Sequence, residues 1–251
     1  MSPPITTQPG IRMQPGVDMQ NTGVMPTPTA IPHCPPGLEN LYGAARLVMN
    51  LEIPPEFVSS TELVNKYKIW NTLGNVVYCA EEKASRCTRC CQGPTRAFDI
   101  KVTDSCQNNV LHFRRNFVCC PCCCFPCCLQ KVEILLPSGT VLGTIEQKWT
   151  LWHPVFDIKD QHGQTVLVVR NCTPFGRCSE SADVIFYVFS MDGTEIGKLT
   201  KKFVGEKYFS ITFPMDLDVT VKATLLGTLF LLHYMFFEMY DKKQRPRPLC
   251  L

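Results

Sequence analysis

Two stretches of the sequence are near copies of each other, and they constrain the fold more than any other feature. Residues 138–149 read SGTVLGTIEQKW, and residues 192–203, an offset of 54, read DGTEIGKLTKKF. Each copy places a glycine-containing turn before an alternating strand, which is the pattern of a β-hairpin. An internal repeat of hairpins predicts a closed or propeller-like all-β body, because closure removes unpaired strand edges.

The same order of strand, turn and strand recurs along most of the chain after residue 60. Apolar runs separated by turns rich in Asp, Asn, Ser or Gly begin at Tyr67, Phe98, Val132, Phe156 and Phe186, and a sixth apolar window begins at Phe209. Six hairpins would give twelve strands, so we predict a mainly β fold, a closed barrel of twelve strands. A chain of 251 residues that is 45% hydrophobic is large enough for such a core.

The sequence divides into four segments. Residues 1–36 contain nine prolines and no regular period, which indicates a disordered, proline-rich tail. We expect residues 37–60 to form a short helix or linker that leads into the barrel. We expect residues 61–240 to form the barrel domain, with a hydrophobic helix over 221–240. Residues 241–251 form a basic tail. The P-x-x-P sequence at 32–35 is a weak motif for SH3 or WW partners, with a plain linker as the alternative.

The window ATLLGTLFLLHYMFF, residues 223–237, is the most hydrophobic part of the chain. As a helix it would span about 22 Å, against about 30 Å for the hydrocarbon core of a bilayer. It is therefore either a short transmembrane helix or a helix that is apolar all round and buried in the β body. A single span would separate the basic tail from the cysteine-rich segment, although both favour the cytosol, so we favour the buried helix.

The segment CCPCCCFPCC, residues 119–128, is unusually dense in thiols. Its cysteines are Cys119, Cys120, Cys122, Cys123, Cys124, Cys127 and Cys128. No signal sequence begins the chain, so we expect reduced thiols in the cytosol and no disulfide framework. A zinc site normally needs a longer loop between its two cysteine pairs, and a polynuclear thiolate cluster is a second metal alternative. We favour fatty acylation, because two or more acyl chains anchor a protein stably to a membrane.

The remaining motifs do not indicate catalysis. The histidines form no H-E-x-x-H pair, and no G-x-S-x-G sequence occurs. The sequence GTEIGKL at 193–199 is one residue short of a P-loop and is explained by the hairpin repeat. The net charge of +3 gives no whole-chain argument for nucleic-acid binding. We therefore expect neither an enzyme nor a nucleic-acid partner.

Several motifs, taken together, resemble those of the phospholipid scramblases. They are PPGLE at 35–39, NKY at 65–67, YCAEE at 78–82, the cysteine block before LQKVEI, GTIEQKW at 143–149, GKLTKK at 197–202 and FPMDLDV at 213–219. The resemblance covers about residues 35–240. It implies a tubby-like barrel of twelve strands around a C-terminal hydrophobic helix, and palmitoylation of the cysteine block. It also implies a tail that binds partner modules, and calcium-activated, ATP-independent movement of phospholipids between leaflets.

The resemblance implies two further features, and the first of them, a calcium segment, departs from the family pattern. The calcium segment reads GEKYFSITFPMDLD, with Gly205 and Lys207 where acidic ligands would begin the loop. Glu206, Asp216 and Asp218 remain as oxygen ligands, but Asp216 and Asp218 could equally be turn residues before the helix. We therefore expect weak calcium binding there, or none. The sequence GKLTKKF matches a nuclear-import signal of some members. Its basic residues are Lys198, Lys201 and Lys202, and the alternative that we favour is that they are solvent-facing residues of a repeat strand.

These features lead to two hypotheses of function. The first is a membrane-anchored phospholipid scramblase at the plasma membrane, with the barrel on the cytoplasmic side and a minor nuclear pool. Its lipid path would need oligomers or bilayer deformation. The second is a palmitoylated adaptor that transports no lipid and has lost the calcium response. A metal-thiolate protein ranks third.

Overall fold

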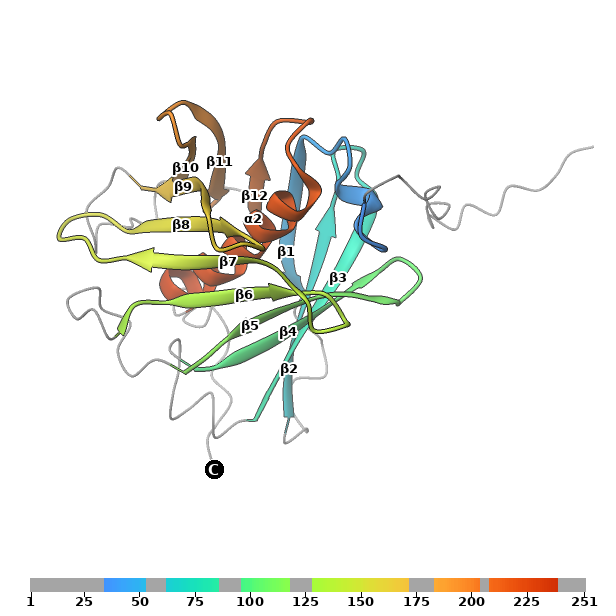
Figure 1. The fold of residues 1–251 in the computed structure, drawn as a ribbon. Coiled ribbons are helices and arrows are strands. Elements are labelled where there is room, and N and C mark those ends of the chain that lie inside the picture. The colour runs from blue at the N-terminus through green and yellow to red at the C-terminus, as the bar shows by residue number, and fades with distance from the viewer. Residues whose placement is uncertain are drawn as a thin grey trace, which may run out of the picture.

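The computed structural model describes residues 34–52, 62–85, 96–117, 128–171, 183–203 and 208–238. Twelve antiparallel strands form a closed barrel, as the sequence predicts (Figure 1). The strands are β1 (Arg46–Glu52), β2 (Glu62–Trp70), β3 (Val76–Ser85), β4 (Phe98–Asp104), β5 (Asn109–Arg115), β6 (Lys131–Leu135), β7 (Val141–Lys148), β8 (Val155–Asp160), β9 (Thr165–Arg170), β10 (Val184–Ser190), β11 (Glu195–Lys201) and β12 (Phe209–Thr212). A short helix, η1 (Glu39–Leu41), precedes them, and the helices α2 (Val219–Leu232) and η4 (His233–Phe237) follow.

Each strand pairs with its neighbours in sequence, and β12 closes the barrel against β1, with Val48 opposite Ser210. Alternation sets the inner face, as in β4, where Phe98, Ile100 and Val102 are buried and the residues between them are exposed. This period of two places one set of side chains in the core and the other outside.

Five hairpins share one turn, which extends the repeat visible in the sequence. In each turn the first residue donates its N–H to the carbonyl four residues later, at 2.9–3.0 Å, and the fourth residue donates back to the first. The fourth position has positive φ in every turn and is occupied by Gly74, Gln107, Gly139, Gly163 and Gly193. The strand register shifts at each turn, as expected for a type I turn followed by a bulge.

The sixth apolar window and the segment before the barrel differ from the sequence prediction. Residues 209–219 form one strand and a helix start rather than a sixth hairpin, and the twelfth strand is β1. The described part of the predicted entry segment, residues 37–52, contains the short helix η1 and the strand β1, so the barrel already begins at Arg46. Leu47 and Met49 are buried on alternate positions of β1, and pairing with both β12 and β2 satisfies its backbone. The apolar residues between positions 38 and 49 resemble a helical pattern only because η1 and β1, two short elements, follow each other there.

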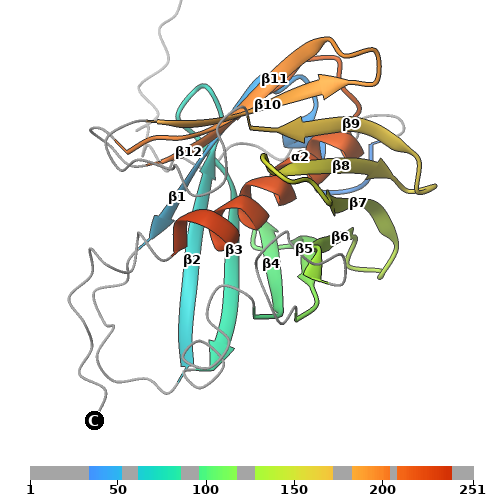
Figure 2. The same ribbon diagram turned by 90° about the vertical axis from the view of Figure 1, so that its left-hand side faces the viewer.

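The two ends of the barrel carry different connections. The five matching turns lie at one end, which we call the hairpin rim. The opposite end, the loop rim, carries the connections from β3 to β4, β5 to β6 and β7 to β8, among others. Helix α2 begins after β12 at the hairpin rim and passes through the barrel toward the loop rim (Figure 2).

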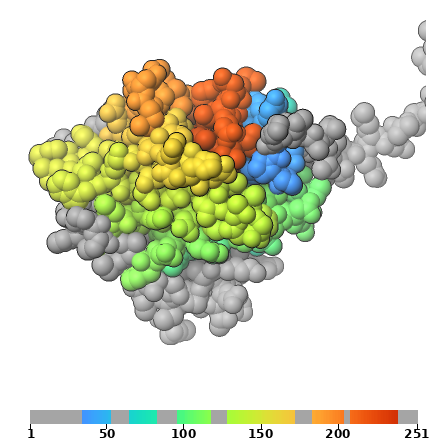
Figure 3. All heavy atoms as spheres, viewed as in Figure 1, coloured from blue at the N-terminus to red at the C-terminus, as the bar shows by residue number. Residues whose placement is uncertain are grey.

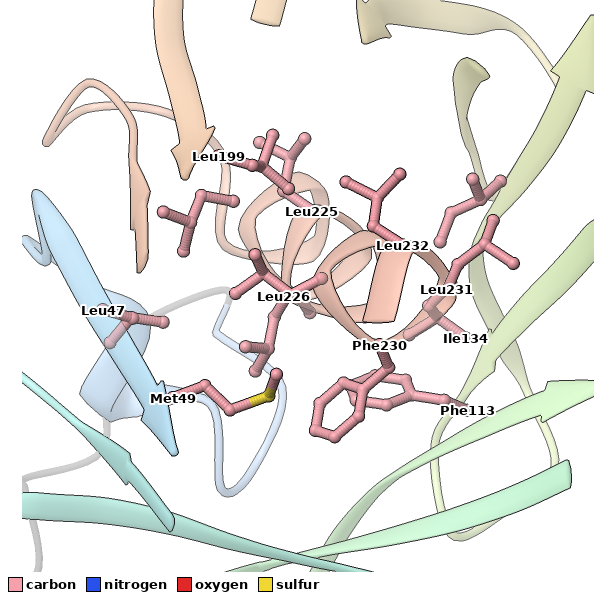
Figure 4. Packing of buried hydrophobic residues seen from close by; sticks show 14 of the residues in the cluster. Leu47, Met49, Phe113, Ile134, Leu199, Leu225, Leu226, Phe230, Leu231 and Leu232 are labelled. Atoms are coloured by element: carbon pink, nitrogen blue, oxygen red, sulfur yellow. The ribbon is translucent and has the colours of Figure 1, made fainter. Parts of the chain in front are cut away.

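The helix fills the barrel interior. Eleven of the fourteen residues of α2 are buried, on all sides of the helix. Phe230 packs against Phe113 of β5, and Leu226 lies beside Met49 of β1 (Figure 4). The Phe230 ring also meets Tyr67 of β2 edge-on, with centroids 5.1 Å apart. A helix with apolar residues all round is stable only when it is enclosed, which explains its position in the barrel.

Candidate functional site

The cysteine-rich segment is attached to the loop rim. It joins β5 to β6, and Cys119, Cys120, Cys122, Cys123, Cys124 and Cys127 lie outside the described residues. Cys128, the last of the seven predicted cysteines, is described, and its side chain is only 3% exposed. The Gln130 side chain donates to the carbonyl of Cys128 at 3.2 Å, and the backbones of Gln130 and Gln147 hydrogen-bond at 2.9 Å. The segment therefore ends in a fixed position beside the end of β7.

Two of the three predicted calcium ligands are described, and one of them has a structural role. Asp218 caps the N-terminus of α2, where its carboxylate accepts hydrogen bonds from the backbone N–H of Thr220 at 2.8 Å and of Val221 at 3.3 Å. Such a cap stabilises a helix by about 1 kcal/mol. Asp216 is exposed in the preceding turn, and Glu206 lies outside the described residues. Across the described ranges, no group of three or more His, Cys, Asp or Glu residues is arranged to hold a metal ion.

A buried lysine lies next to this segment. The ammonium of Lys222 donates to the backbone carbonyls of Leu41, Ala44 and Met215, at 3.1, 2.9 and 2.8 Å. Burial lowers the pKa of Lys222, and the negative charges of Asp216 and Asp218 partly oppose this shift. This lysine ties η1, the start of β1 and the turn before α2 to the first turn of the helix. The Lys222 ammonium thus already binds a backbone carbonyl, that of Met215, within the predicted calcium segment.

The three predicted nuclear-import lysines do not share one environment. Lys198 is exposed on β11. Lys201 is buried, with its ammonium 4.0 Å from the centre of the Phe209 ring. Lys202 forms an ion pair with Asp183 at 3.1 Å. Only part of the basic sequence therefore faces solvent, and its middle residue belongs to the interior of the barrel.

A buried ionic network holds the other end of the helix at the loop rim. The Arg96 guanidinium donates two hydrogen bonds to Glu82, at 2.7 and 3.0 Å, and one to Glu238 at 2.8 Å. Tyr234 of η4 and Asn65 of β2 each donate to the same Glu82 oxygen at 2.9 Å. The side chains of Arg96, Glu82 and Glu238 are 0–4% exposed. The network joins β2, β3 and the connection from β3 to β4 to the last turn of the helix.

Electrostatic effects in this network are strong because water is excluded. Burial disfavours charge on Arg96, but its hydrogen bonds to Glu82 and Glu238 outweigh that cost and raise the pKa above the usual arginine value. Arg115 donates to the Arg96 carbonyl at 2.7 Å. Burial and the nearby positive charge of Arg96 lower the pKa of Arg115 to about 10. Burial also raises the pKa of Tyr67 and Tyr234, whose hydroxyls are 3.0 Å apart.

The sequence analysis assigned no role to this network, although a signal for it was present. Glu82 shares the inner face of β3 with Tyr78 and Ala80, so the period of two already directs a carboxylate into the core. A buried carboxylate requires a partner. The identity of that partner, Arg96, could not be read from spacing, because Arg96 lies in the connection before β4, where no alternation indicates which way a side chain points.

The helix has the length and composition of a membrane-spanning segment, but it is enclosed here. Residues Val219–Phe237 form one apolar helical run, and 78% of its most hydrophobic 18-residue window is buried within the protein. Withdrawing the helix would expose side chains that each contribute about 1.5–3 kcal/mol when buried. The structure therefore corresponds to the buried helix favoured from the sequence.

Comparison with known proteins gives a consistent assignment. The family model described as Scramblase matches residues 25–239. Phospholipid scramblase 2 of Bos taurus is 40% identical over 225 residues, which cover 86% of this chain and 76% of the relative. Phospholipid scramblase 1 of Homo sapiens is 37% identical over 231 residues, 88% of this chain and 72% of the relative. Phospholipid scramblase 4 of Homo sapiens is 34% identical over 251 residues, which cover 94% of this chain and 74% of the relative. No solved structure matches the chain.

Proposed function

The chain belongs to the phospholipid scramblase family, and from this premise we propose that it moves phospholipids between membrane leaflets, in both directions and without ATP. The movement breaks no covalent bond: the protein lowers the barrier to headgroup crossing. The observation that carries the proposal is the match to the family over most of the chain, including the barrel and its enclosed helix.

The filled interior limits how such a protein could act. The core that surrounds α2 is closely packed, with Leu225, Leu226 and Phe230 at 0% exposure. A phospholipid headgroup is polar and cannot cross such a core without a large desolvation cost. We therefore place the lipid path outside the barrel, at an oligomer interface or in a bilayer deformed by the protein.

Attachment to the membrane is proposed to occur through palmitate on the cysteine block at the loop rim. Cys128 is buried, whereas the other six cysteines lie outside the described residues. Acylation requires an accessible thiol, so we expect palmitate on some of those six and not on Cys128. The barrel would then lie on the cytoplasmic side of the plasma membrane, with SH3 or WW partners reached through the proline-rich tail and a minor nuclear pool.

Calcium stimulation is proposed to be weak. A hard cation needs several oxygen ligands, and its affinity rises with their negative charge. Here Asp218 already caps α2, and Lys222 places a positive charge nearby. The response to calcium therefore depends on Asp216 and on Glu206.

The test is a lipid-scrambling assay with the purified full chain in proteoliposomes that contain a fluorescent phospholipid in both leaflets. Dithionite bleaches only the outer leaflet, so scrambling appears as bleaching beyond half of the signal. We expect such bleaching without ATP and a small increase with calcium. Bleaching that stops at half, at all calcium concentrations, would reject the proposal.

A second function is favoured by the same observations on the calcium segment. With Asp218 used as a cap and Lys222 beside it, the chain has the features of an acylated adaptor that has lost the calcium response. The barrel would then act as a scaffold for partner proteins. Membrane binding that disappears when the cysteine block is replaced by alanine, together with an absence of scrambling, would support this function.

A further inference from the structure

The connection from β7 to β8 presents large apolar side chains to solvent. Within four residues, Trp149 is 53% exposed, Leu151 is 67% exposed and Trp152 is 67% exposed. We call residues 149–154 the tryptophan loop. In Figure 3 this yellow-green connection projects at the left edge of the molecule. The other large exposed apolar residues among those described are Tyr42, Leu73, Phe117, Met191 and Met215, and no two of these lie within four residues of each other in the sequence.

The loop has a defined conformation that holds these side chains outward. The Thr150 hydroxyl donates to the carbonyl of His153 within the loop. Pro154 is buried, and its carbonyl accepts a hydrogen bond from the backbone of Asn171 at 3.4 Å. These hydrogen bonds order the loop backbone in advance, so binding through the apolar side chains costs mainly the ordering of those side chains themselves.

The tryptophan loop lies at the same rim as the proposed palmitate anchor. The loop follows Lys148, and the cysteine-rich segment ends beside Gln130, which is hydrogen-bonded to Gln147. Cys128, the last cysteine of the segment, is described and precedes Gln130 by two residues, so the segment ends beside the strand that leads into the tryptophan loop. Phe117, which is 50% exposed, leads into the same segment from β5. An acyl chain on this segment would bring the tryptophan loop to the membrane surface.

Charges around the loop are largely paired and do not specify an ionic partner. Lys148 forms an ion pair with Asp157 at 2.9 Å, and Lys131 lies 3.6 Å from Glu146. The loop itself contains no Asp, Glu, Lys or Arg. Tryptophan is the residue that favours the boundary between headgroups and acyl chains, because its ring is apolar and its N–H is polar. The chemistry of the loop therefore fits a lipid interface.

We propose that the tryptophan loop inserts into the headgroup region of the cytoplasmic leaflet and orients the barrel with its loop rim toward the membrane. This inference rests on the membrane attachment in the proposed function, not on lipid scrambling itself. It makes the loop a second, non-covalent contact beside the acyl chains. The hairpin rim then faces away from the bilayer.

The protein contains a matched internal reference for the test. Its three tryptophans are Trp70, Trp149 and Trp152. Trp70 ends β2 at the hairpin rim, the opposite end of the barrel from the tryptophan loop. A Trp70→Phe variant reports only on the loop, and a Trp149→Phe/Trp152→Phe variant reports only on the hairpin rim.

The experiment uses the full acylated chain bound to phosphatidylcholine and phosphatidylserine vesicles that contain brominated phosphatidylcholine, a short-range quencher. For insertion to a depth of about 5–10 Å, we expect the Trp70→Phe variant to lose about half of its fluorescence, and the double variant to lose almost none. Loop tryptophans that remain unquenched on vesicle-bound protein, or quenching equal to that of Trp70, would overturn the inference. The unquenched result would assign the loop to a protein partner instead.

A second measurement separates this inference from the proposed function. Scrambling is assayed in the same vesicles. Quenched loop tryptophans without scrambling would support the inference and reject the scramblase activity. Scrambling without quenching would do the reverse. A Trp149→Ser/Trp152→Ser variant should bind vesicles at least several-fold more weakly, whereas Leu73→Ser at the hairpin rim should bind as the parent does.

Discussion

Lys222 shows how one residue fixes the start of the enclosed helix. Its aliphatic stem is buried in the first turn of α2, and its ammonium replaces water for three backbone carbonyls. A buried charge is tolerated only when its hydrogen bonds are complete, as they are here. The residue connects the segment before the barrel to the helix inside it.

Replacing Lys222 with methionine should therefore destabilise the protein. The change keeps the apolar stem but removes the ammonium donor from the carbonyls of Ala44 and Met215, while the Leu41 carbonyl keeps only the backbone N–H of Ala44, at a total cost of about 2 kcal/mol. The measurement is urea unfolding monitored by circular dichroism. Lys198→Met, at an exposed position of β11, is the control and should change stability by less than about 0.5 kcal/mol. An unchanged midpoint for Lys222→Met would contradict the role assigned to the ammonium.

The buried tyrosines predict a loss of stability at alkaline pH. Burial raises the pKa of Tyr67, Tyr78 and Tyr234 above the usual value of about 10, so these hydroxyls stay neutral in the folded state while they ionise in the unfolded state. Their contribution is complete below about pH 10 and falls as the pH rises further. Tyrosinate absorbance of these three should appear only together with unfolding. Normal titration of all tyrosines in folded protein would be inconsistent with their burial.

Asp218 and Lys201 show how far the role of a single side chain can be predicted from the sequence. The alternative that Asp218 is a residue of the turn before the helix could be formulated from its position before an apolar run, and the structure gives it the role of helix cap. Lys201 shares the inner face of β11 with Leu199, as the period of two indicates, but its contact with the Phe209 ring depends on the pairing of β11 with β12 and could not be predicted. Long-range contacts determine such side chains, and one sequence does not contain them explicitly.

Among the secondary-structure elements, the enclosed helix is fixed most firmly at its two ends. Asp218 and Lys222 fix its start, and the network around Arg96 fixes its end. Between them the helix contacts β6, β7, β8 and β12. The helix is therefore held at both rims as well as along its length.

Replacing Arg96 with methionine should release the end of the helix. Glu82 and Glu238 would remain buried without their cation, which costs about 3–5 kcal/mol. Adding Glu82→Gln and Glu238→Gln removes the uncompensated charges and should restore part of the stability. Arg114→Met is the control, since its guanidinium is exposed and lies 3.7 Å from Asp99. Equal effects of Arg96→Met and Arg114→Met on the urea midpoint would refute the network.

Hairpins were predictable from the sequence because their signals are local. Alternating apolar residues and a glycine in the turn are sufficient to recognise β7 or β10–β11. β1 was not recognised because its partners, β12 and β2, include a strand about 160 residues away. The correct total of twelve strands thus came partly from a wrong element, the supposed sixth hairpin.

The whole molecule has two unlike ends. Five tight turns form the hairpin rim, whereas the loop rim carries the cysteine-rich segment, the tryptophan loop and the end of the helix. An enclosed helix leaves the basic tail that follows it on the same side of the membrane as the barrel. A spanning helix would place that tail on the opposite side.

Protease protection of the C-terminus distinguishes these two arrangements. The tail, residues 241–251, contains trypsin sites at Lys242 and Lys243, whereas Arg245 and Arg247 each precede a proline and resist trypsin. In intact cells we expect an epitope tag at the C-terminus to resist trypsin added outside, and to be removed after the plasma membrane is permeabilised. Removal of the tag in intact cells would show that the tail is extracellular.

The most direct test of the enclosed helix is a photo-crosslink from its centre in the membrane-bound protein. A diazirine amino acid at Phe230 should couple to peptides from β2 and β5, because the Phe230 ring lies 5.1 Å from Tyr67 and 5.3 Å from Phe113, between ring centroids. Mass spectrometry then identifies the coupled partner. Crosslinks within the barrel are the predicted result, and crosslinks to lipid acyl chains would contradict the account.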